Sequence, residues 1–179
     1  MEGLLQFDTQ VFLLVNHLPH NAFLNALGLG LSAIGTAGII WLFIAGVLFI
    51  FEEKKDHFVF APLFLAGATS WFLVEKILKP WIARPRPMPD IGAIILGMNL
   101  SDSYSFPSGH ATIAWALAYV LARKEPRWKW GFYVLAFLIS LSRVYIGKHY
   151  PGDIISGGII GWAIGTVSLV IFKKFRLPR

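Results

Sequence analysis

Three short clusters of polar residues interrupt a sequence that is otherwise strongly apolar. The first cluster, residues 79–87, contains Lys79 and two arginines, Arg84 and Arg86, which alternate with two prolines. Proline fixes its own φ and disfavours the helical conformation in the residue before it, so these cations are held on a stiff, extended segment. Arginine offers a planar fork of donors that fits phosphate oxygens, and lysine offers a point charge. The cluster indicates an anion site, although anchoring of a helix end to lipid headgroups would account for it equally well.

The second cluster is Pro107-Ser108-Gly109-His110. Proline and serine are ordinary residues at the start of a helix. The amino terminus of a helix also binds anions, because its first N–H groups are free and its dipole favours negative charge. Gly109 would let the backbone approach an oxyanion closely, and His110 adds a titratable group at the same place. An interfacial histidine is the alternative interpretation of His110 alone.

The third cluster is Ser142-Arg143 followed by His149-Tyr150-Pro151-Gly152-Asp153. His149 and Asp153 are four residues apart, which puts two side chains on one face of a helix. A carboxylate bonded to one ring nitrogen of a histidine fixes the tautomer and leaves the other nitrogen free as nucleophile or base. A charged residue at the start of a membrane helix is a functional site by default. This cluster therefore predicts a catalytic pair.

The composition indicates what kind of protein carries these clusters. Of the 179 residues, 56% are hydrophobic and 15% are charged, and the mean hydropathy is +0.62. A single globule of this size cannot hide so much apolar surface from water, and soluble nucleic-acid binders are basic without being so apolar. The absence of cysteine excludes disulfides, thiolate metal sites and thiol nucleophiles. We expect an integral membrane protein with one domain over residues 1–179 that binds no nucleic acid.

The apolar stretches predict an all-α, polytopic helix bundle with five to six transmembrane helices. A helix needs roughly 17–25 apolar residues to cross the hydrocarbon core of a bilayer. Four stretches between charges meet or approach this length, the shorter ones by extending into their polar ends. They are residues 58–74, 108–122, 130–142 and 154–172.

The N-terminal region is harder to divide into helices. Residues 4–18 repeat apolar side chains at helical spacing, which predicts an interfacial helix. A turn at Pro19-His20-Asn21 follows. We expect one span at residues 31–51 after a partly inserted segment around Gly28, and two spans are the alternative.

The sixteen Lys and Arg residues divide between the two ends of these helices. Ten of them fall in the connections 52–57 and 123–129 and in the tail 173–179, which lie on one side of the membrane if there are five spans. The positive-inside rule makes that side cytoplasmic, so we expect a multi-pass plasma-membrane protein with a cytoplasmic C-terminus. The other six lie on or near the opposite face and need another explanation: Lys76, Lys79, Arg84, Arg86, Arg143 and Lys148.

The expected topology brings the three clusters to the same extracytoplasmic end of the bundle. The first cluster ends an outgoing helix, the second begins an ingoing one, and the third straddles the next turn. Two histidines, one carboxylate and several cations at one membrane face are suited to phosphoryl transfer without a metal or other cofactor.

Together the clusters resemble the three signatures of the type-2 phosphatidic acid phosphatase family, which are Lys-x6-Arg-Pro, Pro-Ser-Gly-His and Ser-Arg-x5-His-x3-Asp. Every signature position is matched between Lys79 and Asp153, and the resemblance covers residues 58–172. The N-terminal pattern of Phe7-Asp8, Phe12 and Asn16 is also similar to small bacterial members. The resemblance implies an integral-membrane lipid phosphatase that needs no cofactor.

The resemblance also implies a role for each matched residue. His149 would attack phosphorus to form a phosphohistidine, with Asp153 orienting its ring. His110 would protonate the leaving oxygen and then activate the water that releases phosphate. The phosphate oxygens would be held by Lys79, Arg86, Ser108, Gly109 and Arg143.

Three features lie outside the signatures. Arg84 is a possible accessory residue, for which we favour contact with lipid headgroups over contact with the second phosphate of a diphosphate. Lys148 is expected at the rim of the site. The long connection 88–106 is partly apolar, and connections of this length are usually functional, so we expect a membrane-lying flap beside the lipid entrance.

Several functions remain open at this point. Undecaprenyl diphosphate is the favoured substrate, ahead of phosphatidylglycerol phosphate and phosphatidate, with a lipid A phosphatase or phosphotransferase of the same family as an alternative. A transport protein whose cations line an anion pathway would explain the charges, but not His110 or the His149–Asp153 pair. A vanadate-dependent haloperoxidase shares the anion site, but such relatives are soluble.

Overall fold

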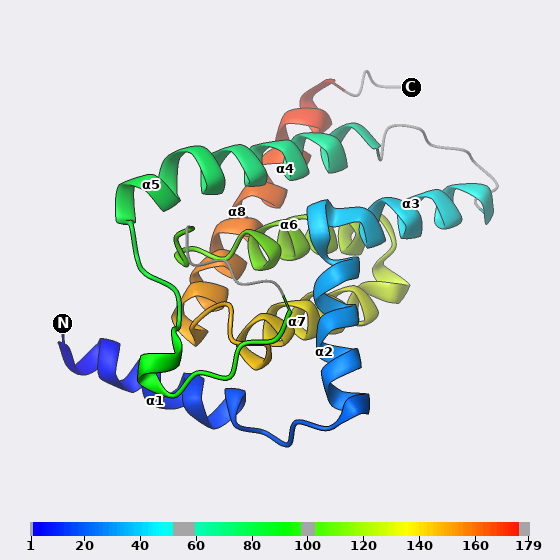
Figure 1. Ribbon diagram of the computed structural model, residues 1–179. Helices are drawn as coiled ribbons and strands as arrows, with labels where there is room; N and C mark the ends of the chain where they lie inside the picture. Colours follow the sequence, from blue (N-terminus) through cyan, green and yellow to red (C-terminus); the bar gives the residue numbers. More distant parts are fainter. Residues whose placement is uncertain (1, 52–59, 98–102, 176–179) are drawn as a thin grey trace.

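The computed structural model describes residues 2–51, 60–97 and 103–175 and is helical (Figure 1). No strand occurs in those three ranges, and the prediction of an all-α chain is confirmed. Short turns of 3-10 helix span Thr36–Gly38, Pro89–Ile91 and Pro126–Trp128, and a π-helical segment Leu73–Leu78 joins α4 to α5. The α-helices are α1 Glu2–Asn16, α2 Ala22–Ile34, α3 Ile39–Phe51, α4 Phe60–Phe72, α5 Lys79–Ile82, α6 Gly109–Lys124, α7 Lys129–Tyr145 and α8 Pro151–Phe175.

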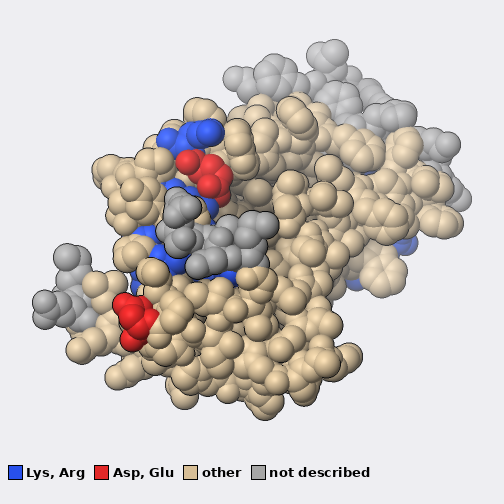
Figure 2. Space-filling model, viewed as in Figure 1, with Lys and Arg blue, Asp and Glu red and all other residues tan. Residues whose placement is uncertain are grey.

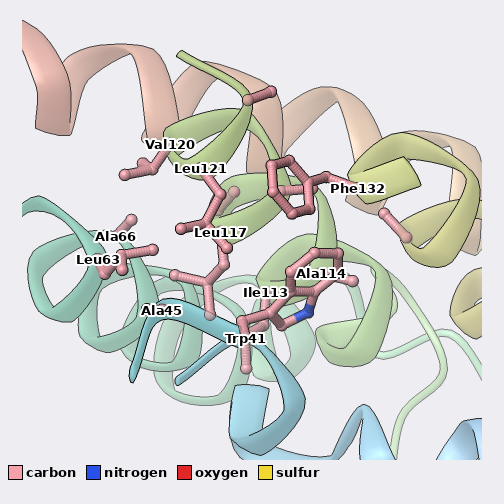
Figure 3. Packing of buried hydrophobic residues seen from close by; sticks show 14 of the residues in the cluster. Trp41, Ala45, Leu63, Ala66, Ile113, Ala114, Leu117, Val120, Leu121 and Phe132 are labelled. Atoms are coloured by element: carbon pink, nitrogen blue, oxygen red, sulfur yellow. The ribbon is translucent and has the colours of Figure 1, made fainter. Parts of the chain in front are cut away.

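Helix α6 is the central helix and packs against α4, α7 and α8. Its side chains are buried along most of its length, as expected of a helix with neighbours on several sides. Leu117 of α6 lies near Trp41 of α3 and Leu63 of α4 in one apolar cluster, shown in Figure 3. The charged and polar residues at the start of α6 are therefore held on a rigid element.

Glycines bring α8 against the backbone of α6. Gly157, Gly161 and Gly165 recur every four residues and share one face of α8. A Cβ atom at Gly161 would lie 2.2 Å from the carbonyl oxygen of Thr112, so no larger residue fits there. This close approach sets the starts of the two helices side by side, where the Ser108 amide donates to the Asp153 carbonyl at 3.0 Å.

Fewer helices than predicted are long enough to cross a bilayer. In the part of the chain that the structure describes, Phe60–Ile82 and Pro151–Lys173 meet a length and apolarity test for a span. The pair Ala22–Ile34 and Thr36–Phe51, bent by 56°, makes a third if it is one span. This corrects the expected five to six spans: α6 and α7 have 16 and 17 residues, or about 24–26 Å at 1.5 Å per residue.

The break in the N-terminal region lies later than predicted. Helix α2 runs through Gly28 without interruption, and the chain bends at residues 35–38 instead. Ala37 and Gly38 have φ values of 51° and 74°, a left-handed conformation that ends a helix. Gly28 instead allows a close contact with the Tyr145 ring, because a Cβ atom at this position would lie 2.7 Å from that ring.

The described part of the connection 88–106 is attached to the body of the protein. The Asn16 side chain accepts from the Ile94 amide at 2.7 Å and donates to the carbonyls of Ile94 and Tyr145, each at 2.9 Å. The Leu96 amide donates to the Ile146 carbonyl at 3.1 Å. Residues 98–102 of the expected flap lie outside the described residues, as do four of the expected cytoplasmic cations: Lys54, Lys55, Arg176 and Arg179.

Candidate active site

Charged side chains gather at one end of the helix bundle. Figure 2 shows Lys, Arg, Asp and Glu together on the side where α5 and α1 lie in Figure 1, while most of the remaining visible face is uncharged. The α5 end, the segment after it and the α7–α8 turn carry charged residues of the three clusters, and the start of α6 adds His110. The three polar clusters of the sequence are thus drawn from four different places in the fold.

His149 lies at the centre of this group. It is 1% exposed and sits in the turn between α7 and α8. The Arg86 guanidinium Nη1 is 3.2 Å from His149 Nε2. Because a guanidinium can only donate, Nε2 is the acceptor and the ring proton is on Nδ1. The Nδ1 atom is 3.4 Å from Asp153 Oδ2, so the ring has its lone pair toward the cations and its proton toward the carboxylate.

The surroundings of His149 keep its ring neutral. Burial lowers the pKa of His149 well below 6.5, and the positive charges of Arg86, Arg143 and Lys79 lower it further. A neutral ring whose Nε2 carries no proton is the form that can attack phosphorus.

We expect the His149 ring to be neutral and protonated on Nδ1 at pH 6, where an ordinary histidine of pKa about 6.5 is mostly charged. Nitrogen-15 NMR of histidine-labelled protein in detergent, with the signal assigned by its loss in His149→Gln, measures both the charge and the tautomer. An imidazolium signal from His149 at pH 6 would contradict the arrangement described above.

Asp153 is fully buried in the first turn of α8. Its Oδ2 accepts from the Tyr150 amide at 2.9 Å, and its Oδ1 accepts from Arg84 Nη1 at 2.7 Å. The first of these bonds is the return bond of a capping box, in which the third helical residue binds the amide three positions before it. The position of the carboxylate is therefore determined by the start of the helix itself.

The three signature cations are each held by other groups. Arg86 donates through Nε to Ser103 Oγ at 2.9 Å and through Nη1 to the Lys148 carbonyl at 2.7 Å. Arg143 Nη1 donates to the Ser32 hydroxyl of α2, and its buried Nε has no hydrogen-bond partner among the residues that the structure describes. Such an orphaned cationic donor fits an anion site.

Lys79 lies next to the start of α6. Its Nζ is 2.6 Å from Oε1 of Glu75, one turn earlier. The same Oε1 would be 2.9 Å from a Cβ atom at Gly109. Lys79 and the Gly109 backbone therefore lie beside the same carboxylate. The two are also expected to bind the same phosphate.

Ser108 caps α6 by accepting from the Ala111 amide. His110 follows in the first turn, with Nε2 3.4 Å from the Thr36 hydroxyl of the α2–α3 break. Arg143, His149, Lys79 and Arg86 are the charged or titratable groups close enough to act on His110 electrostatically. The structure thus brings the eight residues with expected catalytic or phosphate-binding roles to one end of the molecule.

Two residues have a different environment from the one expected. Both amino groups of Arg84 are occupied by carboxylates, Asp153 and Asp8, rather than open to headgroups or a second phosphate. Lys148, expected at the rim, is buried at 4% exposure.

Five residues of the site were not among the predicted catalytic and phosphate-binding residues, although Asp8 belongs to the N-terminal pattern that is similar to small bacterial members. Glu75 had a signal, because it lies four residues before Lys79 in one helical stretch. The others have no local signal, since their partners are distant in the chain. The five are Asp8, Ser32, Thr36, Glu75 and Ser103. No group of three or more His, Asp or Glu side chains suited to a metal ion occurs within the described ranges.

Comparisons with known proteins show which family this chain resembles. A profile described as PAP2 superfamily matches residues 58–177. An undecaprenyl-diphosphatase of Sulfolobus acidocaldarius is 32% identical over 166 aligned positions, covering 92% of this chain and 78% of that protein. A lipid A 4'-phosphatase of Bacteroides thetaiotaomicron is 33% identical over 188 aligned positions, covering 97% and 80%. The crystal structure of a transmembrane PAP2-type phosphatidylglycerolphosphate phosphatase from Bacillus subtilis superposes with a TM-score of 0.75 at 25% identity, covering 100% of this chain and 90% of the other.

Proposed function

This chain belongs to the PAP2 superfamily of membrane lipid phosphatases and is a phosphatase, and from that premise we propose that it hydrolyses lipid diphosphates, undecaprenyl diphosphate by preference, through a phosphohistidine intermediate. The observation that carries the proposal is the setting of His149, whose Nε2 faces Arg86 while Nδ1 faces Asp153. A histidine poised in this way is a nucleophile surrounded by phosphate-binding groups.

The first chemical step forms the intermediate. The Nε2 lone pair attacks phosphorus, the bond from phosphorus to the leaving oxygen breaks, and His110 supplies the proton that this oxygen takes up. The ring of His149 then carries positive charge, which the Asp153 carboxylate next to Nδ1 stabilises. In the second step His110 removes a proton from water, whose oxygen attacks phosphorus and frees Nε2.

The fixed cations stabilise the charge that spreads over the phosphoryl oxygens. When His149 Nε2 attacks phosphorus, Arg86 releases Nε2 and donates to an equatorial phosphoryl oxygen instead. The Nε of Arg143, which has no partner among the described residues, supplies another donor. Lys79 and the amino terminus of α6, with Ser108 and Gly109, bind the oxygens on the remaining side.

The relatives support the proposed substrate, and the charges support the proposed orientation. An undecaprenyl-diphosphatase aligns over 92% of this chain, which supports the diphosphate, while a lipid A 4'-phosphatase of similar identity supports a lipid A phosphate as the alternative. The cations in 123–129 and at Lys173 favour a cytoplasmic face at the ends of α6 and α8 and an extracytoplasmic active site. One phosphatase domain over residues 1–179, with α1 in the membrane interface, is part of this proposal.

The test is a phosphate-release panel with purified protein in detergent, where no gradient exists to drive transport. We expect release from undecaprenyl diphosphate to exceed release from phosphatidylglycerol phosphate, phosphatidate and lipid A, with His149→Ala as the inactive control. A higher kcat/KM for lipid A would assign that substrate instead, and release by the His149→Ala variant would reject the mechanism.

Chelation of metals should leave the activity unchanged. The positive charge that a metal would supply is carried by Lys79, Arg86 and Arg143. Rates measured in excess EDTA, and after adding Mg²⁺ back, should agree within about twofold. A strict requirement for Mg²⁺ would contradict the proposal.

A further inference from the structure

The N-terminal helix α1 reaches the catalytic end through one carboxylate. Asp8 Oδ2 is 2.7 Å from Arg84 Nη2, and Asp8 Oδ1 accepts from the Gly152 amide at 2.7 Å. Gly152 belongs to the first turn of α8, one residue before Asp153. Asp8 therefore binds both the cation and the helix start that hold the carboxylate of the His149–Asp153 pair.

Arg84 links the two carboxylates. Its Nη1 donates to Asp153 Oδ1 at 2.7 Å while its Nη2 binds Asp8, and its guanidinium lies 4.0 Å from the centre of the Tyr150 ring. With both amino groups occupied and one face covered, Arg84 is held in a single geometry.

We propose that Asp8 and Arg84 are positioning residues for catalysis, because they hold Asp153 in place against His149 and share the guanidinium charge between two carboxylates. This inference rests on the proposed function, in which His149 is the nucleophile. It makes α1 part of the catalytic apparatus and gives a role to Asp8, the aspartate of the N-terminal Phe7-Asp8 pattern.

The sharing of charge has a chemical consequence. A guanidinium paired with Asp153 alone would neutralise it and weaken its attraction for the His149 Nδ1–H. With Asp8 bound to the other amino group, Asp8, Arg84 and Asp153 together carry a net charge of −1. Asp153 therefore stays negative and can stabilise the His149 ring, which becomes positive on phosphorylation. Asp8 thereby acts on the transition state and not on the bound phosphate.

The attachment of α1 does not depend on Asp8 alone. Phe12 is fully buried, and its ring lies 5.4 Å from that of Tyr150. Asn16, also fully buried, binds the backbone of Ile94 and Tyr145. An isosteric change at Asp8 should therefore leave α1 docked.

The test compares Asp8→Asn with Asp90→Asn, a matched control whose carboxylate caps the neighbouring Ile91 amide. Asparagine can still accept from the Gly152 amide but carries no charge. We expect kcat of Asp8→Asn to fall about tenfold with KM within about twofold of wild type, because Asp8 does not touch phosphate. Asp90→Asn should change neither, and a merely structural role of Asp8 would not separate kcat from KM.

Two further variants test the connection through Arg84. If Asp8 acts through Arg84, the double variant Asp8→Asn/Arg84→Gln should lose no more kcat than Arg84→Gln alone. In Gly152→Ala, the new Cβ would lie 2.8 Å from Asp8 Oδ2 and displace that carboxylate without removing a charge, so kcat should fall again. This variant serves in place of Asp8→Asn if the latter does not fold.

Wild-type kcat in Asp8→Asn, a loss confined to KM, or multiplicative losses in the double variant would each overturn the inference. None of these results would affect the proposed function, which the phosphate-release panel with wild type and His149→Ala tests separately.

Discussion

Replacement of His149 by alanine is expected to reduce phosphate release by at least about 10³-fold, because the variant has no atom that can form the phosphoenzyme bond. The side chain is almost fully buried, and its Nε2 faces Arg86. The measurement is the steady-state rate with the preferred lipid, beside a thermal-unfolding curve that shows the variant to be folded.

A direct assay for the intermediate strengthens this result. Wild-type protein mixed with phosphorus-32-labelled substrate and denatured in base should retain a label that acid removes, the behaviour of a phosphohistidine. His149→Ala should retain none. The matched control is His17→Ala, which removes an exposed histidine that binds the Gly92 carbonyl. Label retained by His149→Ala would place the nucleophile elsewhere.

Replacement of His110 by alanine is expected to affect two substrates differently. A phosphomonoester releases a poor leaving group that needs a proton, so the variant should lose about 10²–10⁴-fold in the first step. A lipid diphosphate releases a lipid phosphate, a much better leaving group that depends far less on protonation, so this step should survive the loss of His110. Water activation still requires His110, so the reaction should stop at the phosphoenzyme.

Quenched-flow measurement of lipid phosphate release distinguishes these outcomes. His110→Ala with a diphosphate should show a burst of about one product per enzyme followed by a very slow phase. His110→Gln, closer in size, should behave in the same way. Equal losses on both substrates without a burst would show that another group performs the acid and base steps.

The local part of the site was predictable from the sequence. Asp153 and the Tyr150 amide are three residues apart, and their bond follows from the start of one helix. The same holds for Ser108, which caps α6 through the Ala111 amide. Capping bonds of this kind depend only on residue types and short spacings, so they recur wherever a helix begins with such residues.

The place of the N-terminal break was mispredicted because hydropathy does not show where a helix ends. The apolar run 22–51 contains no charge, and its break at residues 35–38 depends on a left-handed conformation at Ala37, a residue with no preference for it. Tertiary contacts decide such a break. Thr36 at the break lies beside His110, and a Cβ at Gly35 would lie 2.6 Å from the side chain of Ile139.

By itself the sequence predicted that this chain is a helical membrane phosphatase and which residues are candidates for its chemistry, because side-chain type and spacing along one helix are local properties. Only the tertiary structure decided how those residues are held: Arg84 is bound to Asp8 across 76 positions and Arg143 to Ser32 across 111. Such pairs form because the docking of α1 and the packing of α2 against α7 leave buried charges that must find partners, and no spacing rule predicts which partner is near.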